Sequence, residues 1–246
     1  GVKANFGTMT KPYHPGHSAE SGITSAKLAA AGYTANPDAV MGNQGFIGAA
    51  STADDADERL ARVADEWMIL GTLFKYHAAC HLTHSAIESV QTLRSRLNVE
   101  DLSSLTITVH PSLLDVCGIP EPKTGLEGKF SLRGTASLAL NDMDTANPAT
   151  FVDEVISSDV VQRLIDKVTI ETDLSLSNFQ SKIVWVDREQ SAHEVFSDLS
   201  KPVTDYQEQG RKLEQKFVSL CEFAGADAVT ASTNVHGLVE AETVAL

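Results

Sequence analysis

Residues 74–84 gather side chains that can move protons and hold anions: Lys75, His77, Cys80, His81 and His84. The chain has 8 histidines in 246 residues, and a solvated surface gives no reason to place three of them within one short segment. An imidazole exchanges protons near neutral pH, and a lysine ammonium pairs with carboxylates. The segment therefore predicts a site that handles a carboxylate. Each histidine taken alone is also compatible with a packed side chain bonded to the backbone.

A helix start is expected directly after this segment. Ser85 and Glu88 have the spacing of a capping box, and apolar residues then recur at helical intervals as far as Leu97. His81 and His84 would then lie just before a helix N-terminus, where free backbone N–H groups and the helix dipole favour an anion. This position strengthens the prediction of a carboxylate site.

A second locally basic stretch, residues 8–17, contains Thr10, Lys11, His14 and His17. Two prolines and a glycine in it argue against regular structure, so we expect a rigid loop. Such a loop is suited to form a wall of the site, and it is equally compatible with a plain surface loop. Neither basic stretch contains Asp or Glu, so each would attract a small anion in an otherwise acidic protein.

The overall charge limits the possible partners. A formal charge of −14 and a pI near 4.9 disfavour nucleic acid and anionic membrane surfaces. No apolar run is long enough for a membrane span, and no secretory signal is visible, so a cytoplasmic location is expected. The 3 cysteines are widely spaced, which suits a reducing compartment. Three histidines and a cysteine could also bind zinc, but no second pair of ligands follows them, so no metal is expected.

The first part of the chain is expected to be helical. An alanine-rich helix at 18–31 should end at Gly32 in the left-handed conformation. Asn36 should cap a short helix, residues 42–48 should form a turn, and another helix should extend from about residue 54 to Trp67.

The middle of the chain mixes strands and helices. Strands are expected at 105–109, 167–171 and 182–186, with helices at 131–141 and between 147 and 164. Thr204 to Gln207 resembles a capping box that opens a helix to about Leu220. Strands interspersed with helices predict an α+β fold with a small sheet.

Several motifs follow one another along the chain: FGTMTKPYH at 6–14, FKYHAACHLTH at 74–84, EGKFSL at 127–132, NPATF at 147–151 and Lys216-Phe217. Together they resemble the MmgE/PrpD family, which includes 2-methylcitrate dehydratase, cis-aconitate decarboxylase and iminodisuccinate epimerase. Their order along nearly the whole chain is that of the C-terminal half of such a protein.

The resemblance implies an all-helical domain joined to a smaller α+β lid, with the site in the cleft between them. Residues 1–70 would be part of the helical domain, residues 71–200 the lid, and residues 201–246 would return to the helical domain. The rest of the helical domain would come from a missing N-terminal half or a partner chain, and family members commonly form homodimers.

The resemblance also implies an enzyme without metal or organic cofactor that acts on a small di- or tricarboxylate. At the positions of two decarboxylase site residues this chain has Cys80 and Gly134, which weakens a decarboxylase prediction. Dehydration of a 2-methylcitrate-like hydroxy acid is the favoured reaction. Epimerisation or isomerisation of an iminodisuccinate-like substrate and a non-catalytic interaction module are the alternatives.

Roles follow from this hypothesis. Lys11 and Lys75 would pair with substrate carboxylates and stabilise an enolate-like transition state, and His81 or His84 would move the proton. His14, Thr10, His17 and His77 would bind and orient the substrate.

Overall fold

The computed structural model describes residues 1–42, 44–52, 55, 58, 61 and 67–233. The chain forms two compact units. One comprises Met9–Thr72 with Gly1, and the other comprises Val2–Thr8 with Leu73–Leu246. Each unit is described separately below, because their relative placement is not defined.

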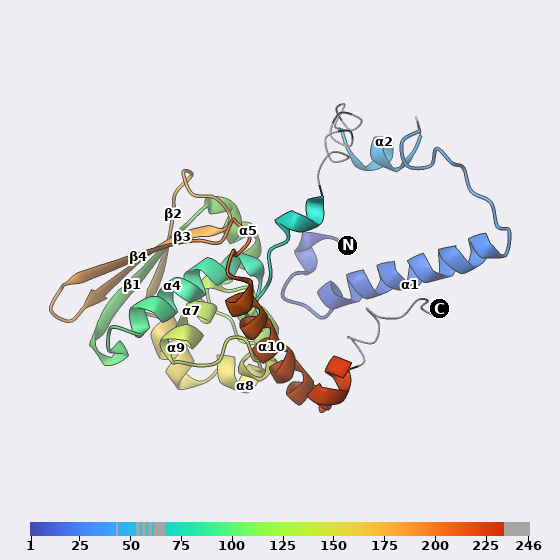
Figure 1. The fold of residues 1–246 in the computed structure, drawn as a ribbon. Helices are drawn as coiled ribbons and strands as arrows, with labels where there is room; N and C mark the ends of the chain where they lie inside the picture. Colours follow the sequence, from blue (N-terminus) through green and yellow to red (C-terminus); the bar gives the residue numbers. More distant parts are fainter. Residues whose placement is uncertain (43, 53–54, 56–57, 59–60, 62–66, 234–246) are drawn as a thin grey trace. The chain divides into compact units, whose positions relative to one another are not determined.

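The larger unit is built on a four-stranded sheet in the order β2-β1-β3-β4 (Figure 1). Its strands are β1 (Leu102–Val109), β2 (Val168–Thr172), β3 (Gln180–Asp187) and β4 (Ala192–Asp198). β1 pairs in parallel with β2 and antiparallel with β3, and β3 pairs antiparallel with β4. The three strands expected from sequence are confirmed, and β4 was not expected.

Helices pack against this sheet to form the core. α4 (His84–Arg94) contacts β3 and β4, and α7 (Leu132–Leu140) contacts α4, β2 and α9 (Asp159–Ile165). Alternate residues of β1 are buried, as expected for a strand with a covered face. Fully buried apolar side chains include Ile87, Val90, Leu105, Ile107, Leu138, Ile183 and Trp185. The predicted α+β class is therefore confirmed.

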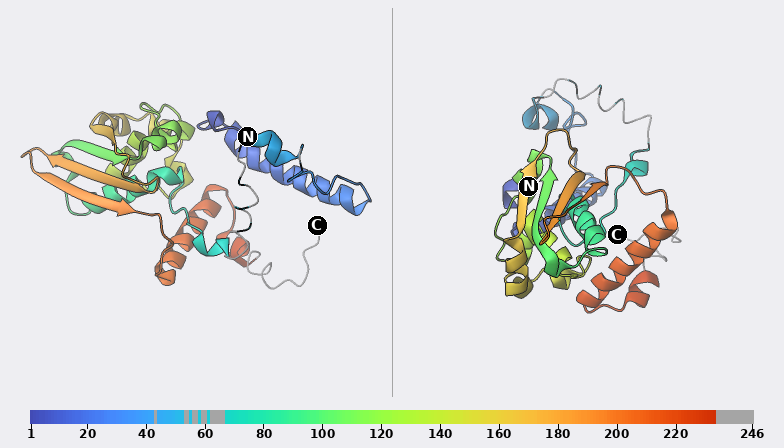
Figure 2. Two further views of the ribbon diagram at one scale, coloured as in Figure 1. Left: turned by 90° about the horizontal axis from the view of Figure 1, so that it is seen from above. Right: turned by 90° about the vertical axis from the view of Figure 1, so that its left-hand side faces the viewer.

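Shorter helices connect these elements, and a long one follows the sheet. The short ones are α5 (Leu114–Cys117), α6 (Gly125–Gly128) and α8 (Asp153–Ile156), with 3-10 turns at His81–Thr83, Val99–Asp101, Pro111–Leu113 and Pro148–Thr150. α10 (Tyr206–Phe223) belongs to the same unit as the sheet (Figure 2). The assignment of residues 1–70, 71–200 and 201–246 to a helical domain and a lid stays a prediction.

The smaller unit contains α1 (Thr10–Ala30), α2 (Phe46–Ala50) and the 3-10 turn Met68–Gly71. The expectation of a loop at residues 8–17 is wrong, because α1 begins at Thr10. Pro12 falls in the first turn, where a helix does not need its N–H, and Pro15 removes one backbone hydrogen bond. Gly32 has φ +88° and ends α1 as predicted, with the Tyr33 amide donating to the carbonyl of Leu28.

Other local predictions need correction. Residues 36–38 form a turn in which the Asp38 amide donates to the Asn36 side chain, rather than a helix. The turn expected at 42–48 is shorter, because α2 begins at Phe46. Most of the helix expected between residue 54 and Trp67 lies outside the described residues. No helix in the described part of the chain has the length and hydropathy needed to span a bilayer.

Both capping boxes are misplaced. α4 starts at His84, so Ser85 lies inside the helix, and no side chain caps that end. α10 is capped one residue later than expected, by Asp205, whose carboxylate accepts from the amide of Glu208. At α10 the sequence offers two adjacent polar residues, Thr204 and Asp205, and the box spacing alone does not choose between them.

Candidate active site

Three histidines meet where the chain enters α4. His81 lies in the 3-10 turn His81–Thr83, and His84 is the first residue of α4. The ring of His84 lies 4.8 Å from that of His77 and 4.9 Å from that of His81, measured between centroids, in edge-on arrangements. The predicted histidine cluster therefore forms, and a short local segment builds it.

His84 has both ring nitrogens bonded to the backbone. Nδ1 lies 3.0 Å from the carbonyl oxygen of Cys80, and Nε2 accepts from the amide of His77 at 3.3 Å. Because a carbonyl can only accept, Nδ1 carries the proton and the ring is neutral. Burial, with His77, His81 and Lys75 as nearby positive charges, lowers the pKa of His84 to about 2. This ring fixes the turn that precedes α4.

His77 is 7% exposed, and its two nitrogens differ. Nδ1 lies 2.8 Å from the hydroxyl oxygen of Thr145, which follows α7. Nε2 has no hydrogen-bond partner among the described residues and lies 3.9 Å from Oε1 of Glu88 on α4. Burial and the ammonium groups of Lys216 and Lys212 lower the pKa of His77 to about 4, so the ring is neutral at physiological pH.

His81 is the most accessible of the three histidines. Its side chain is half-buried and stacks at a tilt on Phe179, with ring centroids 5.4 Å apart. Burial, Lys75 and Lys216 lower the pKa of its imidazole below the usual value. A neutral imidazole at pH 7 is available as a base.

Lysines from α10 complete the surroundings of the cluster. The ammonium of Lys216 donates to the backbone carbonyl of Lys75, and burial together with the charge of Lys75 lowers its pKa. Nζ of Lys212, one turn earlier, lies 5.1 Å from the ring centroid of Tyr76. Lysines four residues apart share one face of a helix, so both ammonium groups face residues 75–77.

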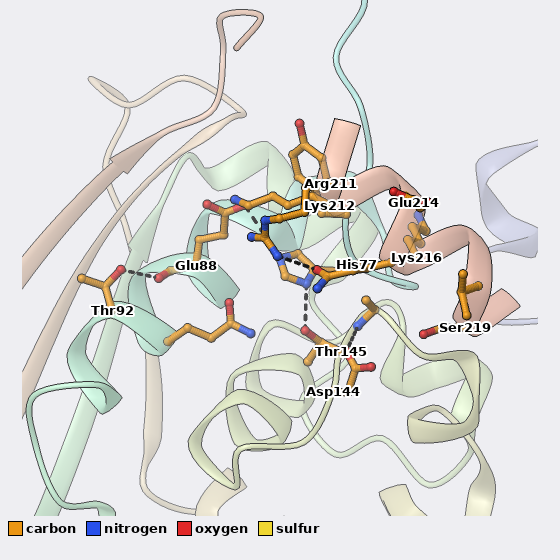
Figure 3. Close-up of a pocket in the computed structure, with 15 residues that line it drawn as sticks. His77, Glu88, Thr92, Asp144, Thr145, Arg211, Lys212, Glu214, Lys216 and Ser219 are labelled. Atoms are coloured by element: carbon orange, nitrogen blue, oxygen red, sulfur yellow. Dashed lines mark hydrogen bonds and ion pairs between the residues drawn. The ribbon is translucent and has the colours of Figure 1, made fainter. Parts of the chain in front are cut away.

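A cavity of about 960 Å³ lies beside the cluster, between α4, α10 and the loop that contains Thr145 (Figure 3). His77, Glu88, Lys212 and Lys216 are among the residues that line it. Its volume is typical of small-molecule sites. Burial raises the pKa of Glu88, and Lys212 opposes this shift in part.

The structure brings together only some of the predicted site residues. His77, His81 and His84 form the cluster, and Lys75 lies close enough to affect two of them electrostatically. Thr10, Lys11, His14 and His17 lie on α1, in the other compact unit. His17 there stacks on Tyr13, and its Nδ1 lies 3.5 Å from Glu20. The roles of these four residues stay predictions.

Of the predicted site residues, only His77 lines the cavity. The lining residues that were not predicted include Glu88, Thr145, Lys212 and Lys216. Lys216 belonged to one of the family motifs, and the spacing from Lys212 was a further signal. Glu88 was read only as part of a capping box, and no local pattern marks Thr145. Among the described residues, no group of three or more His, Cys, Asp or Glu side chains is arranged to hold a metal ion.

Comparison with known families agrees with this geometry. The model of the MmgE/PrpD C-terminal domain matches residues 77–236, which include the cluster, the sheet and α10. The chain belongs to the MmgE/PrpD family. No curated protein matches the chain closely enough to indicate which member of the family it resembles most. The matched residues include the histidine cluster and all the residues that line the cavity except Tyr76.

Proposed function

We propose that this chain supplies part of the active site of a cofactor-independent MmgE/PrpD enzyme that acts on a small di- or tricarboxylate. The reaction we propose is the dehydration of a 2-methylcitrate-like hydroxy acid. The observation that carries the proposal is the cluster of His77, His81 and His84, with Lys75 and Lys216 near enough to lower the pKa of His81. A base beside fixed positive charges is what removal of a proton next to a carboxylate requires.

In the proposed reaction, an imidazole takes the proton from the carbon next to a carboxylate. The electron pair of that C–H bond forms the C=C bond. The hydroxyl group on the adjacent carbon takes a proton from the imidazolium and leaves as water, which restores the neutral imidazole. Lys75 and Lys216 stabilise the negative charge that develops on the carboxylate. Lys11, with Thr10, His14 and His17, would bind the remaining carboxylates from α1.

We assign the proton transfer to His81. In His84, one ring nitrogen donates to the Cys80 carbonyl and the other accepts from the His77 amide, so a proton taken from substrate would break the latter bond. His84 then positions the segment that carries His77 and His81.

A turnover assay of the chain together with an N-terminal half of the family tests the proposal. The substrates are 2-methylcitrate, citrate, cis-aconitate and iminodisuccinate. We expect a new C=C absorbance from 2-methylcitrate, and His81→Asn should lower the rate by about a hundredfold or more. His193→Asn, on β4, is the matched control. Turnover of none of the four substrates would refute the substrate class.

The alternatives are outcomes of the same assay. Racemisation of iminodisuccinate without C=C absorbance would identify an epimerase, which needs the same proton abstraction but no leaving group. A non-catalytic interaction module would bind its partner equally well with or without His81, and it would turn over none of the substrates.

We also propose that the chain associates with an N-terminal half or as a homodimer. α1 carries Tyr13, Ile23 and Leu28 with 62%, 52% and 45% of their surface exposed, and apolar side chains on one helix favour a covering partner. Sedimentation velocity tests this. A monomer at all concentrations that remains monomeric when the N-terminal half is added would refute the association.

A further inference from the structure

The cavity beside the histidine cluster contains a buried polar atom that lacks a partner. His77 is 7% exposed, and its Nε2 makes no hydrogen bond within the described part of the chain. Buried ring nitrogens are normally hydrogen-bonded, so an unpartnered one in a residue that lines a cavity suggests a position for a ligand atom. The nearest charged atom, Oε1 of Glu88, is 3.9 Å away, beyond hydrogen-bonding distance.

The hydrogen bond of the other ring nitrogen, Nδ1, determines whether Nε2 of His77 is a donor or an acceptor. The hydroxyl of Thr145 is buried, and Nδ1 of His77 at 2.8 Å is its only hydrogen-bond partner among the described residues. If this hydroxyl accepted from Nδ1, its own proton would remain unbonded. If Thr145 donates to Nδ1, both the hydroxyl proton and the lone pair of Nδ1 are hydrogen-bonded. The proton of the neutral ring is then on Nε2. Nε2 is then a donor that faces Glu88.

A donor and a carboxyl group 3.9 Å apart define a specific kind of ligand atom. An oxygen about 2.8 Å from both atoms, to one side of the line that joins them, can accept from Nε2–H and, if it carries a hydrogen, donate to Glu88. A hydroxyl group does both, whereas a carboxylate oxygen only accepts and would be repelled by an ionised Glu88. Burial raises the pKa of Glu88, which favours the uncharged form of the carboxyl group.

The opposite wall of the cavity offers positive charge. Lys212 and Lys216 extend from α10 into the lining, and both lie near enough to His77 to lower its pKa. Asp144, Glu214 and Arg211 also line the cavity (Figure 3), and the guanidinium of Arg211 is paired with Glu208. Lys212 and Lys216 are therefore the cations considered for a ligand carboxylate. The arrangement therefore separates a hydroxyl position from a carboxylate position.

We infer that this cavity binds a hydroxycarboxylate, with the ligand hydroxyl between Nε2 of His77 and the carboxyl group of Glu88 and a ligand carboxylate on Lys212 and Lys216. The inference rests on the proposed function and extends it, because it names His77 and Glu88 as the residues that bind the hydroxyl group of the substrate. His77 and Glu88 then distinguish a hydroxy acid from the same acid without its hydroxyl.

Citrate and tricarballylate provide a matched pair of probes, since they differ only in the hydroxyl group. Both are titrated into the 246-residue chain near neutral pH and at low ionic strength, with calorimetry for affinity and NMR of the histidine rings for location. We expect citrate to bind about tenfold tighter or more, the effect of one hydrogen bond of ordinary strength. We also expect citrate to shift the ring resonances of His77.

Two variants of Glu88 connect the preference to this residue. In Glu88→Ala the hydroxyl loses one partner, and the ratio of the two affinities should fall towards one. In Glu88→Gln the amide can still bond to the hydroxyl, so the preference for citrate should be retained. Alanine and glutamine both favour helix, so α4 should form in either variant. Glu222→Gln removes one carboxylate charge from α10 outside the cavity lining and should leave the ratio unchanged.

Equal affinities in the wild-type chain, no shift at His77, or a preference that survives in Glu88→Ala would each overturn the inference. The proposed function is judged separately by turnover. A complete enzyme that dehydrates 2-methylcitrate while this chain shows no preference for citrate would refute only the hydroxyl position. A clear preference for citrate at His77 without turnover of any substrate would refute only the proposed reaction.

Discussion

The buried neutral histidines should make the larger unit sensitive to mild acid, and His84→Gln should reduce this sensitivity. His77 and His84 have pKa values lowered from 6.5 to about 4 and about 2. In the unfolded chain both rings return to the ordinary value, so the unfolded chain binds more protons below pH 6.5. Stability therefore falls as the pH falls below 6.5, and the loss continues towards the folded-state values.

The size of this effect follows from proton linkage. Between about pH 7.5 and about pH 5.5, a ring that is neutral when folded and ordinary when unfolded reduces the free energy of unfolding by about 1.4 kcal/mol. The figure does not depend on the exact folded-state pKa, provided that it lies well below the lower pH. His77 and His84 together should reduce the stability by about 3 kcal/mol over this range.

His84→Gln isolates one of the two contributions. The glutamine amide can donate to the Cys80 carbonyl and accept from the His77 amide, which are the two bonds of the native ring. The loss on acidification should be about 1.4 kcal/mol smaller in the variant than in the wild type. The raised pKa of Glu88 affects both proteins equally, so the difference between them is the quantity to compare.

Urea unfolding at the two pH values, followed by the fluorescence of the buried Trp185, measures these free energies. His17→Gln is the matched control, since that imidazole is 60% exposed and remains solvated whether the chain is folded or not. An equal loss of stability in His84→Gln and wild type would show that His84 is not held neutral. The argument for His81 as the proton carrier would then lose its basis.

Further predictions concern the charge of α10, the backbone and a helix cap. Lys216→Met should raise the pKa of His77 in an NMR titration, because a nearby positive charge is removed, whereas Lys216→Arg should not. Gly125→Ala should destabilise the chain in thermal unfolding, because its Cβ would lie 2.0 Å from a backbone oxygen, whereas Gly210→Ala in α10 has open space and should stabilise by about 0.5–1 kcal/mol. Ser131→Ala should cost about 1–2 kcal/mol in urea unfolding, since its hydroxyl caps α7; an unchanged midpoint would contradict this role.

The regular core of the fold was predictable because its patterns are local. Residues 105–109 alternate between buried and half-buried positions in β1, and Ser131 caps α7 as the sequence indicates. β4 was missed because none of its residues is buried, so its side chains carry little periodic signal. α1 was partly missed because a proline within a helix usually ends it, and here the alanine-rich residues after Pro15 continue the helix.

The candidate site was predictable only where it is local. His77, His81 and His84 form a cluster because one short turn brings them together, and their spacing along the chain shows this. Glu88 and Thr145 approach His77 through tertiary contacts, which residue type alone does not predict. The sequence also did not indicate that the ring nitrogens of His84 bond to the backbone, which depends on the geometry of the turn.

The histidine cluster and helix α10 differ in how far apart along the chain their hydrogen-bonded residues lie. The bonds of His84 join residues 4 and 7 positions apart, whereas α10 reaches Tyr76 and Lys75 across 133 and 141 positions, through Gln209 and Lys216. Short loops close rapidly and at low entropic cost, so the histidine turn can form as soon as it leaves the ribosome. Helix α10, which carries Lys212 and Lys216, is synthesised only about 130 residues later. The cavity is therefore completed late in folding. A ligand that contacts both the histidine cluster and α10 would hold α10 in place, so ligand capture and the last step of folding would be thermodynamically coupled.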